Sequence, residues 1–298
     1  MPLRSSELEF ALCCDLETPL GESPVWDASR DLLWFVDIVL PAVFSFRPNG
    51  AVLTRYDMPD AVTSIGLTTS ERLIVSLRKD VCLFTPSTGA LEHLVTPELD
   101  RDMNRLNDGK VGPDGAFWVG SMHAVRPAQP TAALYRITPD GQCTKVLDDL
   151  HVSNGLAWSP DHHTMYHADS RAPSITSWDF DSASGSISNP RLLAAPSVEE
   201  GLPDGAAVDE DGCYWSAGVT GGCINVFAPD GQLMNRIAVP MEAPTMPCFG
   251  GEDGRTLFLT GLTRETGERV SRGGLFSRRV PARGVPVARF GKPLGPAD

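Results

Sequence analysis

The sequence predicts an all-β protein, a six-bladed β-propeller with four-stranded blades, from three observations. A turn followed by a short apolar run recurs six times along the 298 residues, with successive turns 42 to 50 residues apart. That spacing is typical of propeller blades. Each repeat also holds a second turn, often an Asn-Gly or Asp-Gly pair, which supplies the positive φ angles of tight hairpins. Finally, 28 glycines and 25 prolines indicate many short elements.

The first hairpin of each repeat is defined by its turn and by the strand that follows. The turns lie at Ser29, Glu71, Asp114, Asp161, Asp211 and Asp253. Val, Ile, Leu, Phe and Trp are prominent in the runs that follow, and these residue types favour strands. The runs cover residues 31–37, 72–77, 116–120, 164–168, 213–217 and 256–260.

The second hairpin of each repeat completes a four-stranded blade. Its turns are expected at residues 48–50, 87–89, 139–141, 181–185, 229–231 and, less clearly, 281–284. Helix signals are weak throughout, and residues 97–104 are the stretch where we expect a short helical turn.

The stretch 7–15 precedes the first repeat and has no local partner. We expect it to join the last blade as an added strand, because this pairing closes the ring and removes an exposed sheet edge. Residues 1–298 are thus interpreted as one propeller domain, with residues 1–15 as the closing segment.

Composition narrows the class of partner. The net charge of −13 disfavours nucleic acid and anionic membranes, which require a basic surface. No apolar run approaches the roughly 18 residues of a membrane span, and the N-terminus lacks a signal-peptide pattern. Seven cysteines without a CxxC pair are expected to be reduced thiols. These features predict a cytoplasmic protein with a small-molecule or cation partner and leave its oligomeric state open.

The residues seven positions before the six turns are Glu22, Ser64, Asn107, Asn154, Asp204 and Met246. The innermost strands line the channel, so these positions are expected at one height around its axis. Glu22, Asn154 and Asp204 are oxygen donors that suit a divalent metal and leave sites for water and substrate. Ser64 and Met246 would close the ring without adding charge. The alternative is structural, with Asn154-Gly155 and Asp204-Gly205 as ordinary turns and Glu22 as a strand cap. The shared repeat phase favours the metal.

Arg105 lies two residues before Asn107, and its fork of donors together with the amide is suited to a bound polyol. His123 follows at the end of the next strand, where it either bonds substrate or lies on a hydrated loop. The chain has no GxSxG, P-loop or GxGxxG motif, so serine hydrolase, kinase and dehydrogenase interpretations lose their main support.

The combined motifs resemble the SMP-30/gluconolactonase/regucalcin family of six-bladed propellers, which includes bacterial sugar lactonases. The resemblance covers about residues 16–290 and rests on residues 20–26 (LGESPVW), 105–110 (RLNDGK), 153–159 (SNGLAWS), 203–205 (PDG) and 247–251 (PCFGG). It implies a divalent metal on Glu22, Asn154 and Asp204, with Arg105 and Asn107 contacting a sugar lactone. Vertebrate-type members carry an acidic residue at position 123, whereas His123 resembles the bacterial aldonolactonases and is expected to affect specificity.

We therefore predict an aldonolactonase in which one divalent ion (calcium, zinc, manganese, magnesium or iron(II)) polarises the ester carbonyl. Asp204 is expected to be a ligand and to accept a proton from the attacking water. Two alternatives stay open: a non-catalytic calcium-binding regulatory propeller, and a hydrolase of a non-sugar ester or lactone. The sequence does not specify the sugar or the metal.

Overall fold

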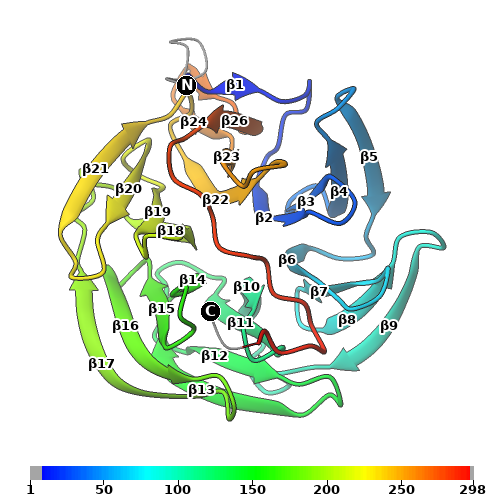
Figure 1. Ribbon diagram of the computed structural model, residues 1–298. Coiled ribbons are helices and arrows are strands. Elements are labelled where there is room, and N and C mark those ends of the chain that lie inside the picture. Colours follow the sequence, from blue (N-terminus) through cyan, green and yellow to red (C-terminus); the bar gives the residue numbers. More distant parts are fainter. Residues whose placement is uncertain (1–8, 296–298) are drawn as a thin grey trace.

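The structure is a computed structural model that describes residues 9–295. Six antiparallel four-stranded sheets form a ring (Figure 1). The first three blades contain β2 (Gly21–Asp27), β3 (Leu32–Asp37), β4 (Ala42–Arg47) and β5 (Val52–Asp57); β6 (Val62–Leu67), β7 (Leu73–Leu77), β8 (Val81–Thr85) and β9 (Ala90–Val95); and β10 (Asn104–Val111), β11 (Phe117–His123), β12 (Ala132–Ile137) and β13 (Cys143–Leu150).

The other three blades complete the ring. They contain β14 (Ser153–Trp158), β15 (Thr164–Asp169), β16 (Ser174–Asp181) and β17 (Ser186–Ala194); β18 (Pro203–Val208), β19 (Tyr214–Gly218), β20 (Cys223–Phe227) and β21 (Leu233–Ala238); and β22 (Pro244–Gly250), β23 (Thr256–Gly261), β26 (Leu275–Arg279) and β1 (Ala11–Leu12). A hairpin of β24 (Arg264–Thr266) and β25 (Arg269–Ser271) lies between β23 and β26 along the chain. The predicted propeller and its blade number are confirmed.

The ring closes through the N-terminal strand, as expected. Ala11 and Leu12 of β1 pair antiparallel with Ser277 and Phe276 of β26. Residues 7 and 8 of the predicted strand lie outside the described range. The prediction of a hairpin turn at 281–284 is wrong, because β1 supplies the fourth strand of the last blade and the chain leaves this sheet after β26. Residues 97–103 form turns and bends before β10 rather than a helix, and Asn104 already belongs to β10.

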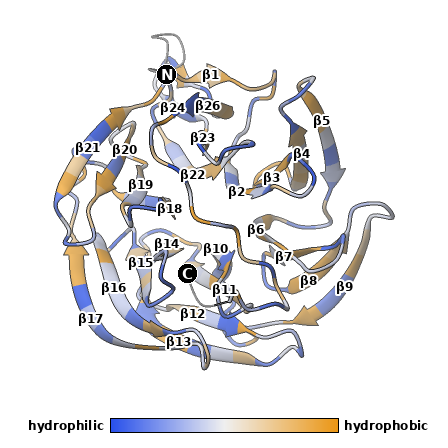
Figure 2. Ribbon diagram, viewed as in Figure 1, coloured by the Kyte–Doolittle hydropathy of each residue, from blue (hydrophilic) through white to orange (hydrophobic). Residues whose placement is uncertain are grey.

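Burial falls from the axis outwards. In the first blade, β2, β3 and β4 are mostly buried, whereas β5 is largely exposed. The outer strands β5, β9, β17 and β21 carry mixed hydrophobic and hydrophilic segments (Figure 2). The core lies between neighbouring blades: one cluster packs Trp34 and Val43 of the first blade with Leu73 and Phe84 of the second. The blades therefore stabilise one another, as apolar burial requires.

Two further observations concern the described chain. All seven cysteines are free. Within residues 9–295, no helix is long and apolar enough to cross a membrane.

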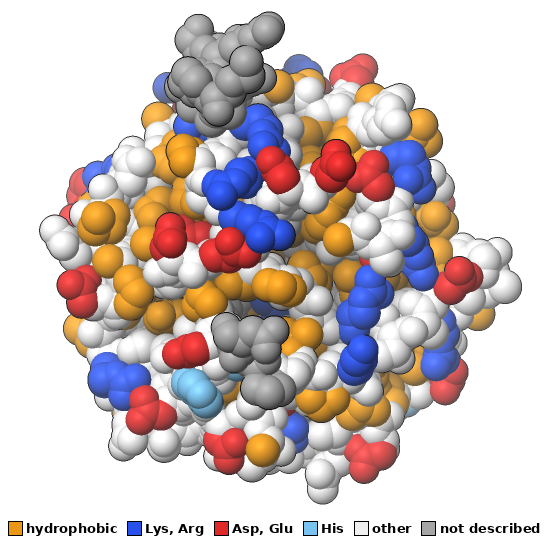
Figure 3. Space-filling model, in the orientation of Figure 1, with side chains coloured by type: hydrophobic (Ala, Val, Ile, Leu, Met, Phe, Trp, Pro, Cys, Tyr) orange, Lys and Arg blue, Asp and Glu red, His pale blue; other side chains and the backbone are white. Residues whose placement is uncertain are grey.

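After β26 the chain crosses one face of the ring, and Figure 1 shows this red segment passing over the centre. Its backbone N–H groups donate to three blades: Val285 to Val208 O (3.4 Å), Phe290 to Leu67 O (2.8 Å), Gly291 to Gly115 O (2.9 Å) and Leu294 to Pro113 O (2.7 Å). Arg289 adds a fourth blade through a 2.7 Å bond from its guanidinium to the buried Asp27 carboxylate. On the face drawn in Figure 3, positive and negative side chains are interspersed.

Candidate metal and substrate site

A cavity of about 330 Å³ lies within the ring and brings together most of the residues singled out from the sequence. It is lined by Glu22, Asn154 and Asp204, the expected metal ligands, and by Arg105 and Asn107, the expected substrate contacts. Each comes from the innermost strand of its blade: β2, β14, β18 and, for the last two, β10. The shared repeat phase therefore corresponds to a shared location.

A β-bulge explains how these side chains reach the cavity. The ladder between the first two strands is irregular between Glu22 and Val25, and between Asn154 and Ala157. Equivalent irregularities span Asn107 and Asp204. A bulge bends its strand and redirects a side chain, and bulges are common beside active sites. The inner strands thus share a local distortion at the functional position.

The same feature corrects the expectation for Ser64 and Met246. In their blades the irregularity falls before the residue, so each is already in the regular ladder, opposite Ser76 and Thr260 respectively. Ser64 is buried and bonds the Ser76 hydroxyl (2.5 Å). Met246 lines a different cavity. A shift of one residue in a strand reverses the face that a side chain occupies, so these two residues do not complete a ring around the site.

A chain of hydrogen bonds fixes the orientation of the Asn154 amide. The Ser170 hydroxyl donates to the carbonyl of Pro203 (2.6 Å), so its oxygen is the acceptor for Asn154 Nδ2 (2.7 Å). The Asn154 oxygen therefore faces away from Ser170 and accepts from Asn107 Nδ2 (2.9 Å). Since an amide oxygen has two lone pairs, it retains one for a cation.

Arg105 continues this network on the other side. Its guanidinium donates to Asn107 Oδ1 (2.8 Å), which requires that the Asn107 nitrogen face Asn154 and the Ser153 carbonyl. Burial lowers the pKa of Arg105 to about 10, so the side chain is still cationic at neutral pH. One charged group thus orients two amides in succession.

The two carboxylates are electrostatically strained without a cation. Burial raises the pKa of Glu22 well above its usual value, and the charges of Asp204 and Asp108 raise it further. Burial also raises the pKa of Asp204 to about 8, with Asp108 adding to the effect and Arg105 opposing it. A divalent cation would offset this cost, because it neutralises both charges at once. The donor set, two carboxylates and an oriented amide oxygen, therefore fits a hard divalent metal.

This donor set differs from the commonest kind of metal cluster. Within residues 9–295, no group of three His, Cys, Asp or Glu side chains is arranged to hold a metal ion. The third oxygen here comes from an amide, which is an ordinary ligand for calcium and related ions.

Asp108 was not singled out from the sequence, although it adjoins Asn107. It is 5% exposed, and its Oδ2 accepts from the Leu156 N–H (3.2 Å), while Oδ1 has no partner among the described residues. Lys110 lies near enough to lower the pKa of Asp108, and its ammonium donates to the Ala206 carbonyl (2.6 Å). The Asp108 charge also raises the pKa of Glu22 and of Asp204, so this charge pair is part of the electrostatic surroundings of the site.

His123 is placed elsewhere. It lines a separate hollow with Asp100, Arg101 and Asp149, and its Nδ1 is 2.7 Å from the Val125 carbonyl oxygen. The cavity that holds the carboxylates is instead bordered by Arg126, which follows three residues later. A role of His123 in specificity stays a prediction.

Three more arginines line the cavity, and the repeat phase does not identify them: Arg126, Arg171 and Arg264. They follow the second strands of the third, fourth and sixth blades. The sequence signal that could have identified these arginines is their position after a second strand. Loops of variable length follow the second strands and hold the residues closest to the channel opening.

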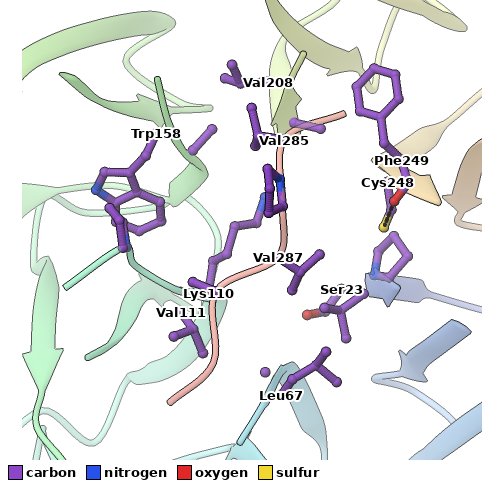
Figure 4. Close-up of a pocket in the computed structure, with 18 of the residues that line it drawn as sticks. Ser23, Leu67, Lys110, Val111, Trp158, Val208, Cys248, Phe249, Val285 and Val287 are labelled. Carbon is purple, nitrogen blue, oxygen red and sulfur yellow. Dashed lines mark hydrogen bonds between the residues drawn. The ribbon is translucent and has the colours of Figure 1, made fainter. Parts of the chain in front are cut away.

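A second cavity, of about 110 Å³, lies within the ring under the C-terminal segment (Figure 4). Val285 and Val287 line it together with Trp158 and Phe249, and the Lys110 side chain extends through it. Its lining is mainly apolar and includes neither Glu22 nor Asp204. We therefore assign the chemistry to the larger, polar cavity.

The fold and the cavity lined by Glu22, Asn154 and Asp204 define a class of protein: a six-bladed propeller whose inner strands present oxygen donors at one end of the channel. Residues 20–263 match the model of the SMP-30/gluconolactonase/LRE-like region. The chain belongs to this family.

Two relatives and one solved structure are similar to this chain. Rabbit (Oryctolagus cuniculus) regucalcin is 34% identical over 80% of this chain and 82% of its own. The 6-deoxy-6-sulfogluconolactonase of Pseudomonas putida is 34% identical over 84% and 86%. The structure of regucalcin from Agrobacterium tumefaciens, described as a calcium-binding protein, superposes with a TM-score of 0.87 over 95% and 98% of the two chains at 22% identity, which shows the shared fold.

Proposed function

We propose that this protein is a metal-dependent hydrolase that opens a sugar lactone to the aldonic acid. The observation that carries the proposal is the placement of Glu22, Asp204 and the oriented Asn154 oxygen in one polar cavity, beside Arg105 and Asn107. The relative from Pseudomonas putida, named as a lactonase, supports the reaction class. The relative described as calcium-binding supports a divalent ion.

Glu22, Asn154 and Asp204 would hold the metal. When bound, a divalent ion in such a site acts as a Lewis acid on an ester carbonyl, an effect worth several kcal/mol. Calcium, zinc, manganese, magnesium and iron(II) are all compatible with this donor set.

The chain's own residues supply orientation and proton transfer. The Arg105 guanidinium and the Asn107 amide line the cavity and can bond the hydroxyl groups of a sugar. Water adds to the lactone carbonyl, the bond from that carbon to the ring oxygen breaks, and the ring oxygen takes a proton. Asp204 is the proposed acceptor of the proton that the water loses, because its carboxylate lines the cavity beside the position proposed for the metal.

The test is proton release, followed with a pH indicator, from a panel of five- and six-carbon aldonolactones. Chelated protein is reloaded with one metal at a time. We expect fast, metal-dependent opening of at least one lactone and its loss in Asp204→Ala. Asp211→Ala is the matched control, because this carboxylate lies in an exposed turn of the same blade.

The outcomes separate the alternatives. Metal binding without opening of any lactone would favour a non-catalytic calcium-binding propeller. Opening of an aryl or other non-sugar ester alone would favour a different hydrolase. Full activity in Asp204→Ala with a normal fold would contradict the proposed role of Asp204.

A further inference from the structure

Four guanidinium groups line the cavity that holds the two carboxylates. Arg105, Arg126, Arg171 and Arg264 all line it, whereas Glu22 and Asp204 are its acidic lining residues. These arginines belong to three different blades, so no single loop accounts for their convergence.

The partners of these arginines do not account for their charge. Arg105 bonds an amide and a carbonyl, and Arg264 donates to the Val219 carbonyl (3.0 Å). Arg126 and Arg171 are exposed, and among the described residues their guanidinium groups have no hydrogen-bond or ion-pair partner. Elsewhere most arginines are paired, as Arg269 of the β24–β25 hairpin is with Glu242 (2.8 Å).

The balance of charge points to an anionic ligand. A divalent ion would compensate Glu22 and Asp204, so the guanidinium groups of Arg126, Arg171 and Arg264 would leave the opening of the cavity positive, in a chain whose net charge is −13. Hydroxyl groups of a neutral sugar need donors and acceptors, but not several cations. The planar fork of arginine matches phosphate, sulfonate and carboxylate, which accept two parallel hydrogen bonds.

We propose that the substrate is a sugar lactone that carries an anionic group remote from its carbonyl, held by Arg126, Arg171 and Arg264. This inference rests on the proposed lactonase function and specifies its substrate class. Phosphate, sulfonate and carboxylate share the required chemistry, and the substrates tested distinguish them.

The experiment compares kcat/KM for a neutral six-carbon lactone with that for the same lactone bearing phosphate, sulfonate or carboxylate at carbon 6. Wild-type protein, loaded with its most active metal, should prefer an anionic lactone by at least about tenfold, and added salt should reduce this preference. Arg171→Gln and Arg126→Gln should each lower the preference, mainly through KM. Arg171→Glu should lower it further, because it places a negative charge at the opening.

Arg269→Gln is the matched control, since Arg269 is exposed, paired with Glu242 and close along the chain to Arg264. It should leave the preference unchanged. Calorimetry provides a second readout: the 6-phosphorylated aldonic acid should bind the wild-type protein more tightly than the unphosphorylated acid, and Arg171→Gln should narrow the difference.

The results distinguish this inference from the function on which it rests. Equal turnover of neutral and anionic lactones, or variants that reduce both alike, would overturn the anionic substrate and leave the lactonase intact. Failure to open any lactone would overturn both.

Discussion

Ser170→Ala tests the hydrogen-bond network that orients the proposed metal ligand. Ser170 is 8% exposed, and its hydroxyl bonds both Asn154 Nδ2 and the Pro203 carbonyl. The variant removes one oxygen atom and leaves both groups without this partner. The Asn154 amide can then turn its nitrogen towards the cavity, an orientation that repels a cation.

Two measurable effects follow. Each buried group that loses its partner costs about 1–3 kcal/mol, and water from the adjoining cavity reduces the cost, so we expect a loss of about 2 kcal/mol in the free energy of unfolding. Removal of a group that orients a ligand typically lowers metal affinity about 10- to 100-fold, which corresponds to roughly 1.4–2.8 kcal/mol.

The assay is metal affinity by calorimetry or chelator competition, with thermal unfolding in chelator as the measure of stability. Ser177→Ala is the control, because Ser177 lies in the same blade, is similarly buried and bonds the Arg191 carbonyl (3.3 Å) away from the cavity. It should lower stability slightly and leave metal affinity unchanged. A folded Ser170→Ala variant with wild-type metal affinity would refute the role of this network.

Three further predictions concern stability. Burial lowers the pKa of His167 to about 4 from 6.5, so between these pH values the unfolded chain binds one proton more than the folded chain. Acidification from pH 6.5 to 4 therefore lowers the free energy of unfolding. In His167→Gln this decrease should be smaller by about 3 kcal/mol, measured by denaturant titration. Gly155 has φ of 65°, and a Cβ there would lie 2.4 Å from Tyr214 Oη; Gly155→Ala should cost about 2–4 kcal/mol by the same measurement. Arg289→Ala should cost about 1–3 kcal/mol, because it leaves a buried carboxylate with less compensation, without changing lactone turnover per folded molecule.

Each of these has a check within the chain. Gly89 has φ of 72° with no atom within 4 Å of an added Cβ, so Gly89→Ala isolates the backbone cost, about 1 kcal/mol. For the acid effect, His163→Gln is the control, because it makes the same substitution at an exposed residue of the same blade. An Arg289→Ala variant that lost turnover while still folded would show that the C-terminal segment affects the distant cavity.

The sequence was sufficient for the blades and for part of the site. Turn spacing located every inner strand, and the phase of Glu22, Asn154 and Asp204 relative to those turns predicted their common cavity. The prediction was wrong for Met246, because its phase was counted from the turn, whereas the bulge in that blade lies before Met246 and not after it. A bulge is a backbone irregularity without a distinctive residue pattern, so its position is not readable from one chain.

The arginines were missed for another reason. Arg126, Arg171 and Arg264 lie at or beyond second-strand ends, in connections of unequal length. Their convergence depends on how these connections fold over the opening, which no repeat period encodes. His123 illustrates the converse, since its position at the end of β11 suggested the cavity, whereas its ring lies in the neighbouring hollow.

The C-terminal segment has a consequence for how the ring comes apart. A propeller joined only through β1 and β26 would have one seam at which neighbouring blades could separate. Residues 284–294 bond backbone groups at Leu67, Gly115 and Val208, and Arg289 reaches Asp27, so the segment links blades that are not adjacent in the chain. Separating the blades at the seam must therefore also break the hydrogen bonds between the C-terminal segment and several blades. The contacts at the seam and these hydrogen bonds are then lost together, so the whole ring unfolds as a single cooperative unit.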